Sequence, residues 1–376
     1  MVIAVNTRFL NGDLEGYGYY IREIFTRICR SHPGHHFVFL FDRAPQLEFE
    51  LPSNVSFQVV GPPARHPVLW KWWYDFMIPP VLKKIKADLF VSPDGFCSTK
   101  TNVPQVLVIH DLDFIHHPGF NKGSHIYYYR RYTPRCIKKA GKIVTISEFS
   151  KEDIVRHYPF AGGKTTVILN GVSKRFTPAS FEERASVKAS YTAGKEYFLY
   201  AGSIHPRKNL INLLKGFSIF KHRQRSTTRL IICGRLAWKS AAFVQALKTY
   251  KYREDVTLTG YIREEELARL MASAYCFIYP SLLEGFGLPV LESMASGVPV
   301  LTSSDSSMQE ICGESALYFD PLDPSSIAAQ MMMIYKDEQL RSRLANESVA
   351  RASNFSWDQA ATSLWEVMES AAALNP

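Results

Sequence analysis

The stretch YPSLLEGFGLPVLESMASGVPVLTS, residues 279–303, places two carboxylates, Glu284 and Glu292, on either side of a glycine-rich turn. The short apolar runs at its two ends are typical of buried strands, whereas residues 288–296 have the pattern of a short helix. Glu284 is then expected in a loop and Glu292 about one turn inside the helix. The start of that helix offers unpaired N–H groups and the positive end of the dipole, so it attracts anions, phosphate above all.

Strand-like runs alternate with helical stretches along the rest of the chain. The first series of strands is expected at residues 2–9, 36–42, 55–60, 89–93, 103–111 and 142–147. After a turn-rich link, the second is expected at residues 196–202, 229–234, 256–260, 276–281, 299–303 and 316–320. Alternation of this kind predicts parallel, doubly wound sheets, and two series predict two Rossmann-like domains. Ligands bind beyond the carboxyl ends of such strands, so we expect the site in a cleft between the domains.

Bulk composition agrees with this picture. The 376 residues are 46% hydrophobic and 21% charged, as in a soluble protein of about two domains. The six cysteines form no CxxC pair, so we expect them to be reduced and buried, which favours the cytosol. No apolar run approaches the roughly 18 to 20 residues that a spanning helix needs, and we expect any membrane contact to be peripheral.

The positive charge lies entirely in the first half. Residues 1–180 carry 23 Lys and Arg against 14 Asp and Glu, a balance of +9, whereas residues 181–376 carry 21 of each. No nucleic-acid-binding signature accompanies this charge. An anionic membrane face or a phosphorylated acceptor suits it, and so does a solvated basic surface without a partner.

Aromatic and basic residues are interleaved in residues 65–86. The stretch contains Trp70, Trp72 and Trp73 together with Arg65, Lys71, Lys83, Lys84 and Lys86. Such a pattern suits a helix that lies among anionic headgroups, and the same tryptophans suit the core of a domain. Residues 127–139 form a second basic and aromatic stretch with the same two interpretations.

Several of these segments resemble glycosyltransferase family 4, group 1 type. The resemblance covers nearly the whole chain and is carried by residues 108–114, 145–150, 168–178, 200–210, 258–274 and 279–300. It implies a retaining, nucleotide-sugar-dependent enzyme of GT-B fold, in which two Rossmann-like, doubly wound α/β domains face each other across a cleft. The acceptor domain is then expected at residues 1–175 and the donor domain at 176–356, with a C-terminal helix, about 357–376, that packs back on the first domain.

The resemblance also assigns roles at the turn. Glu284 is implied to contact the donor sugar and Glu292 the nucleotide ribose. The backbone of Gly285, Phe286, Gly287 and Leu288 then approaches the diphosphate, because a glycine allows close approach. Arg207 and Lys208 are expected to meet the phosphate charge, with Gly202 and Ser203 in the turn that precedes them. Many family members carry Arg where this chain has Ser203, so one phosphate contact is either missing or supplied by Arg207.

The first half contributes weaker candidates. His110 ends a predicted strand, and the resemblance puts it near the reacting sugar, while a purely structural histidine is the other interpretation. Gly16 and Gly18 lie between the first strand and the first helix and either line the cleft or serve the turn.

A rival interpretation starts from Asp111 and Asp113, which imitate the Asp-x-Asp pair of GT-A glycosyltransferases and lie close in sequence to His110, His116 and His117. A second Rossmann-like half with its own phosphate and ribose contacts makes a metal unnecessary, so we expect none.

The sequence therefore predicts a metal-independent glycosyltransferase without a cofactor, whose UDP- or GDP-sugar donor is a substrate. The sugar is a hexose such as mannose, and the acceptor is a saccharide or a lipid-linked saccharide of cell-surface polysaccharide or glycolipid synthesis. A nucleotide-sugar epimerase of the same architecture and a noncatalytic nucleotide-sugar binding protein are the alternatives. A pyridoxal-phosphate phosphorylase is disfavoured by chain length and by the lack of a lysine motif. We expect a cytoplasmic protein that contacts the inner face of the plasma membrane at most peripherally.

Overall fold

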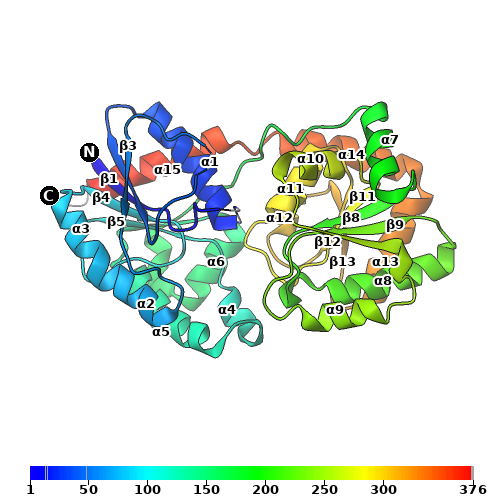
Figure 1. Cartoon of the computed structure of the whole chain (residues 1–376), viewed down its shortest axis with the longest axis horizontal. Helices are drawn as coiled ribbons and strands as arrows, with labels where there is room; N and C mark the ends of the chain where they lie inside the picture. Colours follow the sequence, from blue (N-terminus) through cyan, green and yellow to red (C-terminus); the bar gives the residue numbers. More distant parts are fainter. Residues whose placement is uncertain (13, 15, 48, 374–376) are drawn as a thin grey trace. The chain divides into compact units, whose positions relative to one another are not determined.

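The strands of the chain form two separate sheets, and the strand pairs in both are parallel (Figure 1). This is seen in a computed structural model, which describes residues 1–12, 14, 16–47 and 49–373. The sheets belong to two compact units. Unit 1 comprises Met1–Gly171 and Ser356–Pro376, and unit 2 comprises Val172–Phe355.

Unit 1 contains a seven-stranded sheet in the order β3-β2-β1-β4-β5-β6-β7. Its strands are β1 (Val2–Asn6), β2 (His36–Phe41), β3 (Val55–Val59), β4 (Leu89–Ser92), β5 (Gln105–Ile109), β6 (Lys142–Thr145) and β7 (Thr165–Val167). Its α-helices are α1 (Gly16–Ser31), α2 (Pro67–Trp72), α3 (Ile78–Lys84), α4 (Asp113–His116), α5 (Gly123–Lys139), α6 (Glu148–His157) and α15 (Trp357–Ala372). A π-helical turn, η1 (Trp73–Met77), joins α2 to α3, and 3-10 turns lie at η2 (Pro118–Phe120) and η3 (Pro159–Lys164).

Unit 2 contains a six-stranded sheet in the order β10-β9-β8-β11-β12-β13. Its strands are β8 (Tyr197–Ala201), β9 (Arg229–Cys233), β10 (Val256–Gly260), β11 (Cys276–Tyr279), β12 (Val300–Ser303) and β13 (Ala316–Phe319). Its α-helices are α7 (Phe181–Thr192), α8 (Leu210–Gln224), α9 (Ala241–Lys248), α10 (Glu264–Ala272), α11 (Leu288–Ala295), α12 (Met308–Cys312), α13 (Pro324–Lys336) and α14 (Glu338–Ala352). The 3-10 turns η4 (Pro206–Lys208) and η5 (Arg253–Asp255) complete it. Figure 1 shows α8 and α13 side by side on one face of this sheet and α11 and α14 on the other.

The predicted parallel, doubly wound sheets are confirmed, and each of the twelve predicted runs contains a strand. The reason is burial: every residue of β5, β8 and β11 is buried, as expected for parallel strands covered on both faces. The sequence analysis missed β7, because this strand has only three residues, TTV, and is only partly buried.

In both sheets the strand order reverses near the centre of the sheet. In unit 1 the order reverses between β1 and β4, and in unit 2 it reverses between β8 and β11. Ligands of doubly wound sheets bind at such switch points, beyond the carboxyl ends of the strands. Each unit therefore has one place where a site is expected.

Helix α15 follows unit 2 in sequence but packs against α1 in unit 1. The Trp365 ring stacks on His32 with 3.7 Å between ring centroids, and Arg27 Nε lies 2.7 Å from Asp358 Oδ1. Gly171, the last residue of the first segment of unit 1, runs so close to α15 that an added Cβ would lie 2.0 Å from the Trp357 backbone nitrogen. Glycine is therefore required there.

The three tryptophans of residues 65–86 differ in burial, so the stretch fits partly the core interpretation and partly the membrane-surface interpretation. Trp70 and Trp73 are buried, and their indole nitrogens donate to the backbone oxygens of Ala64 and Val60. Trp72 is 49% exposed. Two of the three tryptophans therefore belong to the core, and only one is available at the surface.

All six cysteines are buried with free thiols, as predicted. Among the described residues, none of the helices is both long enough and apolar enough to span a bilayer.

Candidate active site

Two segments meet at the β8/β11 switch point of unit 2. Arg207 and Lys208 follow β8 in the turn η4, and Glu284 follows β11 in a loop, as the sequence predicts. Because β8 and β11 are hydrogen-bonded neighbours, their carboxyl ends lie at the same edge of the sheet. Three candidate residues from distant parts of the sequence are thereby brought together.

These three residues form an ion-paired cluster. Lys208 Nζ lies 2.5 Å from Glu284 Oε1, and Arg207 Nη1 lies 3.1 Å from the same oxygen. The Ser281 hydroxyl also donates to this oxygen, and Lys208 donates to the Tyr279 hydroxyl at 2.7 Å. Two cationic side chains thus contact one carboxylate oxygen, and cations of this kind can also bind the oxygens of a phosphate.

Glu284 is ionised over the whole physiological pH range. Burial alone raises the pKa of this 7% exposed carboxyl, but the charges of Arg207 and Lys208 outweigh burial and lower the pKa to about 2. An ionised carboxylate only accepts hydrogen bonds, and sugar hydroxyls can supply them.

The turn after Glu284 depends on glycine. Gly287 has a φ of +94° and is the N-cap of α11, and a Cβ added there would lie 2.4 Å from the Met308 Cε. The Ser307 hydroxyl fixes the loop by donating to the backbone oxygens of Glu284 at 3.0 Å and Phe286 at 3.1 Å. The backbone of Gly285 to Leu288 is therefore held at the start of a helix, where anions are stabilised.

The remaining residues of this segment are mostly buried. Phe286 is 2% exposed and lies 6.0 Å from the Phe355 ring, so its side chain anchors the loop. Glu292 is the fifth residue of α11, about one turn inside it as predicted, and is 8% exposed.

Gly202 and Ser203 form the turn after β8. Gly202 has a φ of +147°, and a Cβ added to Gly234 would lie 1.9 Å from the Gly202 oxygen, so the two glycines allow their loops to touch. The Tyr200 hydroxyl donates to the Ser203 backbone oxygen at 3.0 Å, and the Tyr200 ring stacks on Tyr279 with 5.9 Å between centroids. Tyr200 therefore connects this turn to Tyr279, the residue whose hydroxyl accepts from Lys208.

His110 lies at the carboxyl end of β5 in unit 1. Its Nε2 is 3.0 Å from the Pro93 backbone oxygen, and its ring meets the edges of Tyr17 and Tyr20 at 4.8 and 4.9 Å. A carbonyl oxygen only accepts, so Nε2 carries the proton and Nδ1 remains a hydrogen-bond acceptor. Burial lowers the pKa of His110, which keeps the ring neutral at pH 7.

Gly16 and Gly18 lie inside the first turn of α1 and not in the loop before it, which corrects the prediction. A Cβ added to Gly18 would lie 2.4 Å from the Phe9 backbone oxygen, whereas one added to Gly16 would meet nothing within 4 Å. Gly18 therefore serves close packing between α1 and the segment that follows β1.

The residues of the rival metal interpretation do not form one group. The Asp113 backbone N–H donates to Asp111 Oδ1 at 3.1 Å, and His117 Nδ1 lies 3.0 Å from Asp113 Oδ1. His116 Nε2 instead lies 2.8 Å from Asp153 Oδ2. Within the described ranges, the one group of three side chains that could together ligate a metal is His116, Asp153 and His157. Neither aspartate of the Asp-x-Asp pair belongs to it.

Sequence reasoning missed several residues that build the unit 2 cluster, namely Tyr279, Ser281 and Ser307. Tyr279 and Ser281 stand at and just beyond the end of a predicted strand, where polar groups are expected to line a site, and this was the available signal. Ser307 had no such signal, because its partners are more than 20 residues away.

Two family models match consecutive parts of the chain. The one described as Glycosyltransferase Family 4 matches residues 16–176, and the one described as Glycosyl transferases group 1 matches residues 182–351. The chain belongs to glycosyltransferase family 4, group 1 type. This assignment makes the protein an enzyme, a glycosyltransferase, and places Glu284 and Glu292 within the group 1 match.

Other proteins resemble this family 4 glycosyltransferase over its full length. The O-antigen chain mannosyltransferase B of Escherichia coli is 27% identical over 374 residues, which are 96% of this chain and 98% of that protein. The sucrose-phosphate synthase of Thermosynechococcus elongatus superposes with a TM-score of 0.80, at 18% identity and full coverage of both chains. Anabaena Alr3699/HepE in complex with UDP and glucose gives a TM-score of 0.76, at 15% identity, covering 98% of this chain and 99% of that one. At such identities the two structures establish the GT-B fold alone.

Proposed function

We propose that this glycosyltransferase transfers a hexose from a GDP- or UDP-sugar to a saccharide or lipid-linked acceptor in cell-surface polysaccharide synthesis. The transfer retains the anomeric configuration and needs no metal ion. The observation that carries the proposal is the ion-paired cluster of Glu284, Arg207 and Lys208 beside the start of α11. Mannose is the first sugar to test, since the full-length relative is an O-antigen mannosyltransferase, and the UDP complex of Alr3699/HepE keeps both bases in the test.

The roles follow from charge and position. Arg207, Lys208 and the start of α11 stabilise the diphosphate as negative charge develops on it, without a metal. Glu284 accepts hydrogen bonds from the donor sugar, and Glu292 accepts them from the ribose. Retention follows if the acceptor attacks from the face that the phosphate leaves, because the departing phosphate then accepts the proton of the acceptor hydroxyl. His110 orients that hydroxyl through its Nδ1 lone pair.

A panel of nucleotide sugars tests this assignment directly. The purified enzyme is mixed with GDP-mannose, UDP-glucose and related donors, and binding, slow donor hydrolysis and transfer to mannose-containing acceptors are measured. The expected product has the anomeric configuration of the donor, which proton NMR reports. Formation of an isomeric nucleotide sugar, or binding without hydrolysis or transfer, would contradict the proposal.

We further propose that unit 1 contacts an anionic membrane on its cytoplasmic side and takes a lipid-linked acceptor there. Exposed aromatic rings support this: Trp72 and Phe76 are 49% and 47% exposed and stack at 4.9 Å. Helix α5 packs beside α2 through contacts such as that between the Trp70 and Tyr128 rings at 5.3 Å. The exposed basic residues of this region are Arg65, Lys83, Lys84, Lys86, Arg130, Arg131, Arg135, Lys138 and Lys139. Aromatic and cationic side chains together suit the headgroup layer of a bilayer.

A further inference from the structure

A buried ion pair lies at the β1/β4 switch point of unit 1. Arg8 follows β1 and Asp94 follows β4, and Arg8 Nε lies 2.7 Å from Asp94 Oδ2. The two residues are 7% and 4% exposed. In unit 2 the equivalent strands, β8 and β11, are followed by Lys208 and Glu284. Each unit thus carries a cation after its first central strand and a carboxylate after the second, at the point where doubly wound sheets bind ligands.

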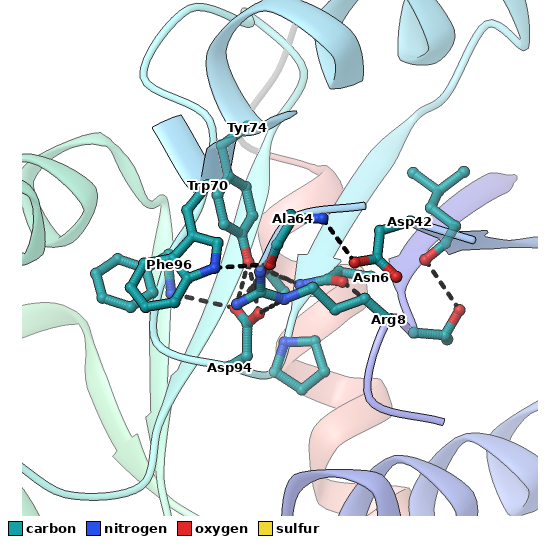
Figure 2. A network of polar contacts seen from close by, with 12 residues as sticks. Asn6, Arg8, Asp42, Ala64, Trp70, Tyr74, Asp94 and Phe96 are labelled. Carbon is teal, nitrogen blue, oxygen red and sulfur yellow. Dashed lines mark hydrogen bonds and ion pairs between the residues drawn. The ribbon is translucent and has the colours of Figure 1, made fainter. Parts of the chain in front are cut away.

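A network of hydrogen bonds fixes this pair. Figure 2 shows the Tyr74 hydroxyl and the Arg8 guanidinium converging on the Asp94 carboxylate. The Tyr74 oxygen lies 2.5 and 2.6 Å from the two carboxylate oxygens, and the Asn6 amide donates to Tyr74 at 2.8 Å. Asp94 is therefore fully engaged by the protein, and Arg8 is held in one orientation.

The outer edge of the Arg8 guanidinium has no such partner. Nε makes the one side-chain hydrogen bond of Arg8, so the four N–H groups of Nη1 and Nη2 meet no acceptor among the residues that the structure describes. Nη1 and Nη2 are not among the described buried polar atoms that lack a partner, so they reach the surface and are accessible from outside the chain. An oxygen-rich molecule from outside the chain can satisfy them.

Aromatic surface adjoins this edge. The guanidinium carbon of Arg8 lies 4.7 Å from the centre of the Phe9 ring, which is 40% exposed. The Tyr17 ring is 38% exposed and lies 5.2 Å from Phe9 and 4.8 Å from His110. Aromatic faces beside a few fixed hydrogen-bonding groups are typical of small-molecule sites, and they suit the apolar CH face and the polar hydroxyls of a pyranose.

We propose that Arg8, Phe9 and Tyr17 form a saccharide-binding subsite of unit 1. The Nη1 and Nη2 groups of Arg8 donate to adjacent hydroxyl oxygens of one sugar residue, and the rings of Phe9 and Tyr17 contact its CH face. A neutral sugar fits better than a phosphate, because Asp94 already balances the Arg8 charge and repels a second anion at short range. The inference rests on the proposed function in taking this saccharide to be the acceptor.

The test uses the full chain with methyl α-mannoside and the α1,2-, α1,3- and α1,6-linked mannobioses, whose binding is measured by calorimetry. Arg8→Lys keeps a cation for Asp94 but removes the planar fork. It is expected to weaken binding of the best saccharide roughly tenfold to a hundredfold. The matched control is Arg43→Lys, since Arg43 pairs with Asp42 at 2.8 Å after the neighbouring strand β2 and is 38% exposed. The control is expected to bind like the parent enzyme.

Phe9→Ala gives a second test, because this exposed ring can be removed without opening the core. It is expected to weaken saccharide binding about tenfold while thermal unfolding stays unchanged. The proposal is overturned if the parent enzyme binds none of the four saccharides at millimolar concentration, if Arg8→Lys and Phe9→Ala bind them normally, or if inorganic phosphate competes with them. Binding of GDP and UDP is followed in parallel. Normal nucleotide binding with no saccharide binding rejects only the subsite, whereas saccharide binding without nucleotide binding rejects only the proposed function.

Discussion

Replacing Glu284 by Gln tests the unit 2 cluster most directly. The substitution removes the carboxylate that contacts Lys208 at 2.5 Å and Arg207 at 3.1 Å. The pKa of Glu284 is about 2, against roughly 4.3 for an unperturbed Glu. At about 1.36 kcal/mol per pKa unit, ionised Glu284 stabilises the folded state by about 3 kcal/mol.

The pH dependence follows from the direction of this shift. Because the pKa of Glu284 is lower in the folded than in the unfolded state, its ionised form stabilises the folded state fully above about pH 4.3. This stabilisation is lost as the pH falls toward about 2. We therefore expect Glu284→Gln to lower the free energy of unfolding by about 3 kcal/mol at pH 7, with the difference from the parent enzyme narrowing below pH of about 4. Urea unfolding, with hydrogen exchange of residues 276–303 as the local probe, measures both effects.

A surface pair supplies the control. Glu183 contacts Arg269 at 3.2 Å, and its side chain is 39% exposed, so Glu183→Gln is expected to cost less than about 1 kcal/mol. In activity assays, Glu284→Gln is expected to slow transfer roughly tenfold to a hundredfold through the lost charged hydrogen bond. It should not weaken GDP or UDP binding, because the site becomes more positive. Unchanged stability at pH 7, or equal and small losses in nucleotide binding and rate, would refute the assigned role.

Further predictions concern the helix start, the metal and the membrane. Glu292→Ala is expected to weaken nucleotide binding by about 1.5 to 3 kcal/mol, measured by calorimetry, and a change in rate alone would contradict the ribose contact. Gly287→Ala places a side chain at a φ of +94° and is expected to cost roughly 1 to 3 kcal/mol by thermal unfolding, whereas Gly163→Ala, in open space, should cost little. EDTA should leave transfer intact, and loss of activity that manganese restores would favour the Asp-x-Asp interpretation. Replacing Lys83, Lys84 and Lys86 by Gln should release the enzyme from anionic vesicles at low salt, at about 1 kcal/mol per residue, with donor binding unchanged. Absence of vesicle binding by the parent enzyme would leave a solvated basic surface.

Local sequence patterns were sufficient to predict most of the strands and the glycine-rich turn of unit 2. The continuous apolar runs predicted twelve strands because parallel strands are buried on both faces. The glycine turn followed by a helix was also readable, since Gly287 and the start of α11 lie within a few residues of each other. The placement of Gly16 and Gly18 in a loop was wrong, because both lie in α1. Gly18 serves close packing against the Phe9 backbone oxygen, a contact that the local sequence does not show.

By itself, then, the sequence determined two doubly wound sheets and the family, since these depend on periodicity and on motifs of contiguous residues. Tertiary structure alone decided which charges meet. Arg8 and Asp94 are 86 residues apart, and Lys208 and Glu284 are 76 apart, yet each pair is in contact. It also decided that Trp70 and Trp73 are buried while Trp72 is exposed. The physical reason is that the order of strands in a sheet brings chain segments together irrespective of their separation in sequence, and no local pattern encodes that order.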